Sequence, residues 1–272
     1  MEVLCKDKIE AFIVPWLSKG KRGNKVGVEL WQFVRAILYR LKSGCQWRLL
    51  PVDLFFEHKV ISWQGVYYHF RKWVLDGSFK RVWIELLKAS HRLLDLSSMQ
   101  LDGSHTPAKN GGEHIGYQGR KKAKTTNALF LCDNQGQPLS MATPQSGQHH
   151  DAYEMEVLFE ELCTLVNEAG IDLNGVFMNA DSGFDTAALP QQCSQKGIEA
   201  NIDRNERSQK CQQQYRYFDE LLYKRRFVIE RMNAWIDSFK ALLVRFETKV
   251  QHWMAFHFLA FAALLIRKIN KC

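Results

Sequence analysis

The hydrophobic pattern of the chain changes its period near residue 96, and this change most constrains the fold. Before it, apolar residues recur every three or four positions, as between Leu30 and Leu41, which is typical of helices that bury one face. After it, short alternating or apolar runs typical of strands come between helical stretches. This order predicts a helical domain over residues 1–95 and, over residues 96–272, an α/β domain with helices on a mixed sheet.

The first domain is expected to hold three helices. One ends at Gly44, the second begins after Ser62 and ends at Gly77, and the third follows, because serine caps helix starts and glycine helix ends. Residues 67–72 form a cluster of aromatic and basic side chains that looks exposed. Three short basic helices suit a helix-turn-helix-like DNA-binding module, although an ordinary helical bundle gives the same pattern.

The second domain is expected to begin with a strand that ends at Asp102 and a hairpin over residues 125–143. A helix capped by Asp151 comes next, then a strand that ends at Asp181 and a helix capped by Asp185. A last strand, a long amphipathic helix and a final apolar helix complete the order. These alternations predict a sheet covered by helices.

Composition narrows the class of protein. The chain has 272 residues and a net charge of +8, which favours a polyanionic partner. Its 7 cysteines are scattered without a CxxC pair, so we expect neither disulfides nor zinc, and a reducing compartment. Charges in the first ten residues disfavour a signal peptide. The apolar run Trp253–Ile266 is shorter than a membrane span, and we expect it to form a buried helix.

One carboxylate, Glu230, lies on the polar side of the long helix, in a stripe that runs from Tyr223 to Asp237. Such a stripe is usually solvated surface. Asp102 and Asp181, however, each end an apolar strand, where α/β sheets place functional groups. Two strand-end aspartates and one helix glutamate can converge on Mg²⁺, which prefers oxygen ligands.

Three stretches carry a family resemblance: residues 102–126 (DGSHTPAKNGGEHIGYQGRKKAKTT), residues 179–185 (NADSGFD) and residues 223–247. They resemble the DDE transposases of bacterial insertion sequences, groups four and five, over nearly the whole chain. Tyr223, Arg226 and Glu230 match that family's Tyr-x2-Arg-x3-Glu-x6-Lys pattern. Asp237 stands at the place of the lysine, and Lys240 is the nearest lysine.

The resemblance implies a ribonuclease-H-like catalytic domain that cuts and joins DNA with two Mg²⁺ ions, or with Mn²⁺. Asp102 would bridge the two ions, and Asp181 and Glu230 would each hold one. Its partners would be double-stranded DNA, as transposon ends and as target, and a second copy of the chain on that DNA, with no membrane. The location would be the bacterial cytoplasm, at the nucleoid.

Basic and aromatic residues are the candidates for DNA contact, because each neutralised phosphate adds salt-sensitive affinity. They are Arg120, Lys121, Lys122, Lys124, Tyr223, Arg226, Lys240, Tyr68 and Arg71. For the run at residues 120–124, a solubilising loop is the alternative.

Other interpretations stay open. Asp237 competes with Glu230 as the third metal ligand, and His149 and His150 are more simply a polar loop. The same fold could serve a domesticated DNA-binding protein without catalysis, or a nuclease that cuts without joining. The presence of all three acids favours the transposase.

Overall fold

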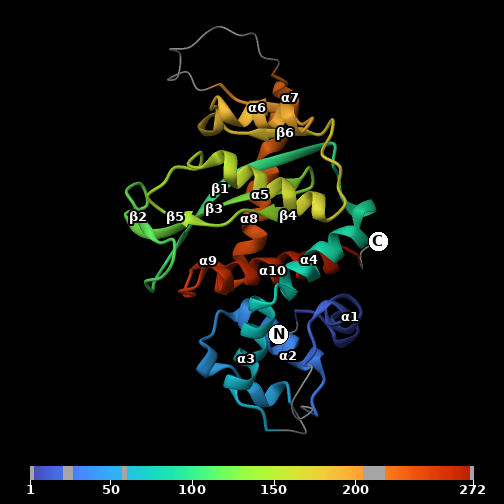
Figure 1. The fold of residues 1–272 in the computed structure, drawn as a ribbon. Coiled ribbons are helices and arrows are strands. Elements are labelled where there is room, and N and C mark those ends of the chain that lie inside the picture. Colours follow the sequence, from blue (N-terminus) through green and yellow to red (C-terminus); the bar gives the residue numbers. More distant parts are fainter. Residues whose placement is uncertain (1–2, 21–26, 57–59, 205–217, 270–272) are drawn as a thin grey trace. The chain divides into compact units, whose positions relative to one another are not determined.

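The computed structural model describes residues 3–20, 27–56, 60–204 and 218–269 (Figure 1). Their contacts divide the chain into two compact units. The helical unit comprises Met1–Ala89, Lys109–Glu113 and Trp235–Cys272, and the sheet unit comprises Ser90–Ala108 and His114–Ala234. The helical unit is thus built from segments that lie far apart in the sequence, whereas the sheet unit is interrupted only by residues 109–113. The functional division into residues 1–95 and 96–272 stays a prediction.

The helical unit contains the predicted N-terminal helices. Its α-helices are α1 Lys6–Phe12, α2 Leu30–Ser43, α3 Trp63–Leu75, α4 Ser78–Ala89, α9 Lys240–Leu243 and α10 Val250–Ile269. The predicted helix ends are confirmed: the Ser62 hydroxyl accepts a hydrogen bond from the Gly65 amide at the start of α3, and α2 stops at Gly44. Gly77 follows α3 in a left-handed conformation.

The core of the helical unit forms around α10, which contacts α2, α3 and α4. The Phe256 ring stacks on Phe70 with ring centroids 4.6 Å apart, and Trp83 lies 5.4 Å from Phe261. By length and composition α10 passes for a membrane span, but 78% of its most apolar window is buried within the structure. The predicted buried C-terminal helix is therefore confirmed.

A buried ion pair also holds the helical unit together. Arg40 of α2 donates to the Glu247 carboxylate over 2.6 Å, although the two residues lie 207 positions apart. The Arg40 guanidinium also lies over the rings of Trp47 and Phe256, at 5.2 and 4.7 Å. A charge pair thus fastens the segment after α9 to an N-terminal helix.

The sheet unit is built on a mixed sheet, as predicted. Its strands are β1 Ser98–Pro107, β2 Gly116–Gln118, β3 Ala123–Asp133, β4 Pro138–Met141, β5 Gln145–Ser146, β6 Phe177–Ala180 and β7 Glu199–Ile202. The order is β2-β3-β1-β6-β7, with β4 and β5 also paired to β3. β3 runs antiparallel to β1, whereas β1, β6 and β7 are parallel to one another. The β3–β4 connection is the predicted hairpin.

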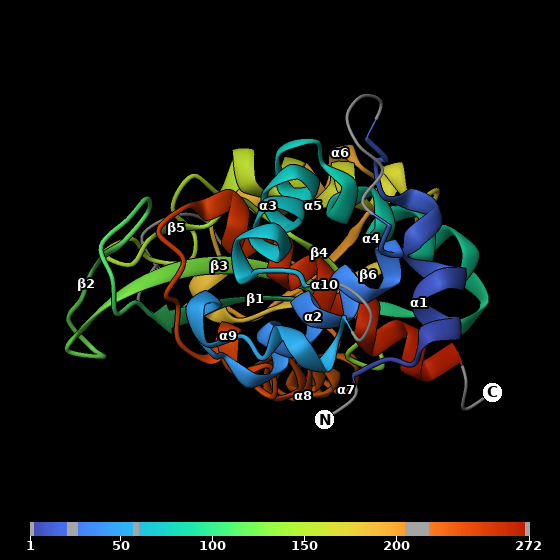
Figure 2. The same ribbon diagram turned by 90° about the horizontal axis from the view of Figure 1, so that it is seen from below.

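Helices cover both faces of this sheet (Figure 2). Helices α5 (Met155–Glu168) and α6 (Ala188–Gln195) lie over one face, and α7 (Glu220–Tyr223) and the start of α8 (Val228–Asp237) lie over the other. The five described cysteines, Cys5, Cys45, Cys132, Cys163 and Cys193, are free; Cys211 and Cys272 lie outside the described residues.

Two predicted helix caps are wrong. Helix α5 begins only at Met155, after Glu154 in a left-handed conformation, because the Asp151 carboxylate instead accepts a hydrogen bond from the Asn127 amide at 2.6 Å. Helix α6 has no side-chain cap at its N-cap residue. The Leu189 amide there donates to the Thr186 hydroxyl, so Asp185 is not the cap.

The long helix predicted around Glu230 is divided. A 3-10 turn, Lys224–Phe227, precedes α8, and Phe239 takes an extended conformation before α9 begins. The break frees the Ser238 carbonyl, which accepts a hydrogen bond from the Lys42 ammonium at 2.8 Å. The predicted apolar stripe is only partly buried, since Trp235 and Leu243 are 38% and 40% exposed.

Candidate active site

The acidic residue Asp102 lies where two neighbouring strands part. β1 continues to Pro107 along β3, so the prediction that Asp102 ends its strand is wrong. Pairing between β1 and β6, however, stops at Gln100. Because β3 supplies hydrogen bonds on one side only, the segment after Gln100 is free of a strand partner on its β6 side. This opening gives the Asp102 carboxylate room beside β6.

Asp181 follows directly on β6, as predicted. Its carboxylate accepts a hydrogen bond from the Gly183 amide at 2.9 Å and so caps a short 3-10 turn, Ser182–Phe184. Gly183 is small, and the turn leads the chain away from the sheet. Asp181 therefore stands at the carboxyl end of a buried strand, next in the sheet to the strand that carries Asp102.

The charge of Asp181 acts on the Asp102 carboxyl. Burial, the largest cause, and the nearby charge of Asp181 raise the pKa of Asp102 to about 7, while Arg226 and the Gly103 amide act in the opposite direction. A carboxyl that is buried beside a second carboxylate is costly to ionise. A divalent cation would remove this cost, because it favours the charged form of both groups. This pair of oxygen donors thus fits a hard metal ion such as Mg²⁺.

Tyr223 and Arg226 lie near the aspartates on the segment that precedes α8. The 3-10 turn that holds Arg226 contacts β1 and β6, and its guanidinium carbon lies 5.7 Å from the centre of the Tyr223 ring. Burial raises the pKa of Tyr223, Arg226 lowers it, and Asp203 and Asp181 raise it. Both residues of the predicted motif thus share an electrostatic environment with the aspartates.

Glu230 occupies the first turn of α8, and its side chain is exposed. The start of α8 rests on the β3–β4 turn, where Arg231 donates to the Gln135 carbonyl at 2.8 Å. A Cβ on Gly136 would lie 2.9 Å from the Val228 carbonyl oxygen, so only glycine permits this approach. Across the described residues, no group of three or more His, Cys, Asp or Glu side chains is arranged to hold a metal ion. The closeness of Glu230 to the aspartates stays a prediction.

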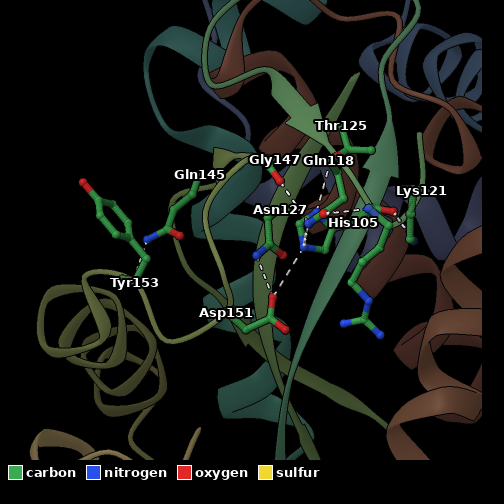
Figure 3. A network of polar contacts seen from close by, with 10 residues as sticks. His105, Gln118, Lys121, Thr125, Asn127, Gln145, Gly147, Asp151 and Tyr153 are labelled. Atoms are coloured by element: carbon green, nitrogen blue, oxygen red, sulfur yellow. Dashed lines mark hydrogen bonds and ion pairs between the residues drawn. The ribbon is translucent and has the colours of Figure 1, made fainter. Parts of the chain in front are cut away.

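A polar network lies against β1 next to Asp102 (Figure 3). The Asp151 carboxylate packs directly on Gly103, where any side chain would collide with it. It accepts a hydrogen bond from Asn127, and its Oδ1 lies 3.7 Å from His105 Nε2. Sequence reasoning assigned Asp151 to a helix cap and overlooked His105 and Asn127, because their partners lie on other elements.

The predicted basic cluster is exposed at the β2–β3 connection. Arg120, Lys121, Lys122 and Lys124 all face solvent. Lys121 also donates to the His105 carbonyl at 2.9 Å, which ties the cluster to the strand that carries Asp102 (Figure 3). These cations therefore belong to the same unit as the aspartates.

The candidate DNA contacts of the helical unit are more dispersed. Tyr68 and Arg71 are exposed on α3 and line a surface hollow with Lys72, Leu75 and Asp76. Lys240 is exposed at the first position of α9.

The predicted exposure of the whole 67–72 cluster is wrong for two of its members. Tyr67 is only partly exposed and lies 5.1 Å from the Trp47 ring. The His69 ring centroid lies 4.0 Å from that of Phe33, with the two rings tilted by 33°. Aromatic packing thus draws both residues toward the core.

Comparisons with known proteins place the chain in a family. Residues 7–83 match a family described as putative transposase of IS4/5 family, and residues 87–265 match the transposase DDE domain. No curated protein matches the chain.

Solved structures also show similarity. The piggyBac transposase synaptic complex with hairpin DNA has a TM-score of 0.50 and 11% identity, with 99% of this chain and 74% of that chain covered. A pre-cleavage Mos1 transpososome has a TM-score of 0.31 and 10% identity, with 93% and 82% covered. The Mos1 mariner paired end complex with Mn has a TM-score of 0.31 and 11% identity, with 89% and 79% covered.

The likeness to piggyBac transposase supports the ribonuclease-H-like fold, a mixed sheet flanked by helices with a helical region at the N-terminus. The DDE domain match covers well over half of the chain. The chain therefore belongs to the DDE transposases, enzymes that cleave DNA and transfer the cut strand.

Proposed function

We propose that this transposase acts on the ends of an insertion sequence of the Tyr-Arg-Glu-Lys type, with Asp102, Asp181 and Glu230 as the ligands of two Mg²⁺ ions. The observation that carries the proposal is the half-buried Asp102 carboxyl, whose pKa is raised by loss of hydration and by Asp181 and lowered by Arg226. Such a pair of acids is unfavourable alone and favourable around divalent cations. Mn²⁺ is the expected substitute.

The residues have distinct parts in this proposal. Asp102, Asp181 and Glu230 would hold the metal ions, which would supply charge stabilisation for the attacking and leaving oxygens of the phosphodiester. Arg226, whose charge reaches Asp102, holds the scissile phosphate, since a guanidinium binds phosphate through paired hydrogen bonds. Tyr223 supports the Arg226 side chain through its ring and hydroxyl.

DNA binding would use both units of the chain. The cluster Arg120–Lys124 contacts the backbone of double-stranded DNA near the catalytic acids, and Tyr68, Arg71 and Lys240 extend the contact. Residues 1–95 recognise the transposon end, residues 96–272 carry out catalysis, and two copies of the chain assemble on the DNA. The setting is the bacterial cytoplasm, at the nucleoid.

The test uses the full chain, a labelled DNA duplex with an insertion-sequence end, and a supercoiled target plasmid. We expect cleavage at the end of the element and a joined product with Mg²⁺ or Mn²⁺, and neither with EDTA. Cleavage without joining would indicate a nuclease, and binding without either product would indicate a domesticated DNA-binding protein. Both results would contradict the proposal.

A further inference from the structure

Three buried side-chain amides form a hydrogen-bonded row across the parallel strands. Gln100 on β1, Asn179 on β6 and Asn201 on β7 are 0%, 0% and 2% exposed, and we call them the amide row. Asn201 Nδ2 donates to Asn179 Oδ1 at 2.7 Å, and Asn179 Nδ2 donates to Gln100 Oε1 at 2.8 Å. Gln100 Nε2 completes the row with a hydrogen bond to Ser98 Oγ at 2.9 Å.

The amide row also binds the backbone of residues 219–222, which form the cap and most of α7. Asn179 Nδ2 donates to the Leu222 carbonyl at 3.1 Å, and Asn201 Nδ2 donates to the Asp219 carbonyl at 3.0 Å. In return, the Asp219 amide donates to Asn201 Oδ1 at 2.8 Å. Three hydrogen bonds thus fasten residues 219–222 to the sheet.

Apolar burial does little to hold this segment. Of the described residues in α7 and the following 3-10 turn, none is buried, and Leu221 is 76% exposed. A buried strand normally carries apolar side chains, and a buried amide is costly unless it is hydrogen-bonded. The amide row therefore replaces apolar packing with directional contacts, which specify one position of the segment.

The register of the strands links the amide row to the acids. Gln100 pairs with Asn179, and Asn179 pairs with Asn201. Asp102 and Asp181 each follow a member of the row by two residues, so they lie on the same side of their strands. The same strands thus fix two acids and the segment that carries Tyr223 and Arg226.

We propose that the amide row is a positioning device that sets Tyr223 and Arg226 against Asp102 and Asp181. The row holds the backbone of residues 219–222 and need not contact the DNA or the metal itself. Glu230 lies beyond this segment, in the first turn of α8, where Val228 and Ile229 are buried. The catalytic part of this role rests on the proposed function, whereas the structural part, that the row fixes residues 219–227, stands without it.

The test compares Asn179→Leu with Gln145→Leu as a matched control. Gln145 is also buried, and its amide also donates to a backbone carbonyl, that of Tyr153, at 2.7 Å. For Asn179→Leu we expect hydrogen exchange over residues 219–227 to be about tenfold faster, the effect of roughly one net hydrogen bond. The Mg²⁺ concentration for half-maximal cleavage should rise. The control should lose similar stability and change neither quantity.

The outcomes separate this role from the proposed function. Unchanged exchange over residues 219–227 in Asn179→Leu would overturn the positioning role. Faster exchange with an unchanged Mg²⁺ requirement would reduce the row to an ordinary structural contact and would also overturn it. If the wild-type chain shows no metal-dependent cleavage, the proposed function fails, and the exchange data still decide whether the row holds the segment. Should Asn179→Leu not fold, Asn201→Ala removes the outer end of the row and is read in the same way.

Discussion

The two units use different buried polar groups to hold distant segments together. The helical unit buries the charged side chains of Arg40, Arg245 and Glu247, whereas the sheet unit buries the amide row and one carboxyl, Asp133. The ion pair of Arg40 and Glu247 joins segments from opposite ends of the sequence. The amides hold residues 219–222 on the strands that lead to Asp102 and Asp181. The difference suggests that buried charge serves assembly in one unit, and buried amides serve site geometry in the other.

Burial disfavours the charged forms of both partners in the ion pair of the helical unit. Burial raises the pKa of Glu247, although Arg40 and Arg245 lower it, and burial lowers the pKa of Arg40, although Glu247 raises it. For each partner the loss of hydration is the largest cause. Such a pair adds little net stability, but removal of one partner leaves an uncompensated charge. Removing one partner should therefore destabilise the unit far more than removing both.

The largest expected effect is in the sheet unit. Asp102→Asn should lower end cleavage by on the order of 10³-fold or more, because a metal ligand contributes several kcal/mol to the transition state. DNA affinity should stay close to that of the wild type. Cleavage assays and gel shifts measure both, with Asp172→Asn, an exposed acid of the same unit, as control. Full Mg²⁺-dependent cleavage by Asp102→Asn would falsify its assignment.

The next effect is in the helical unit. Arg40→Met should destabilise that unit by about 3–5 kcal/mol, because Glu247 is left buried without its partner. The double variant Arg40→Met with Glu247→Leu should recover most of the loss. Urea unfolding followed by tryptophan fluorescence is the measurement, since all 8 tryptophans lie in segments of the helical unit. Equal losses in the single and double variants would show that the pair itself stabilises the fold.

Acid should weaken the helical unit through His257. Burial lowers the pKa of this residue to about 4, so the folded state keeps it neutral while the unfolded state is protonated below about 6.5. Its contribution to stability is therefore present above pH 6.5 and lost as pH falls toward 4.

Between pH 7 and pH 5 this histidine should cost about 2 kcal/mol of stability. Tryptophan fluorescence during urea unfolding at both values provides the test. His257→Gln, which does not titrate, should flatten the dependence. An equally steep loss in that variant would assign the acid sensitivity to other groups, such as His69, whose pKa is also lowered to about 4.

The smallest expected effect concerns the exposed cations of the sheet unit. Lys122→Gln and Lys124→Gln should each weaken DNA binding and reduce the slope of log affinity against log salt by about 1. Lys196→Gln is the matched control, because that ammonium is already paired with the Glu160 carboxylate at 2.5 Å. Unchanged slopes in the first two variants would mean that the cluster only aids solubility.

Local signals in the sequence were sufficient for much of the fold. The helical period and the flanking Ser62 and Gly44 located α2 and α3, and the turn residues located the β3–β4 hairpin. Asp151 was misjudged because its partner, Asn127, lies on another element 24 residues away. The division of the helix around Glu230 depends on tertiary contacts of Ser238 and Phe239, which no local pattern contains.

The amide row did leave a signal in the sequence. Gln100, Asn179 and Asn201 are polar residues that each lie between two apolar neighbours in a strand, and each precedes an aspartate by two positions. An amide-x-Asp pattern on three strands marks side chains of one face. What the sequence could not reveal is that α7 docks on this face, since that depends on the parallel register of β1, β6 and β7.

The central claim is that Asp102, Asp181 and Glu230 bind the same metal ions. Fe²⁺ with ascorbate and peroxide cuts a polypeptide close to bound iron, and mass spectrometry of the full chain on its end DNA locates the cuts. We expect cuts near residues 102, 181 and 230, all suppressed by excess Mg²⁺ and lost in Asp102→Asn. Cuts near residues 102 and 181 accompanied by cuts at Asp237 and none at Glu230 would contradict the three-acid site.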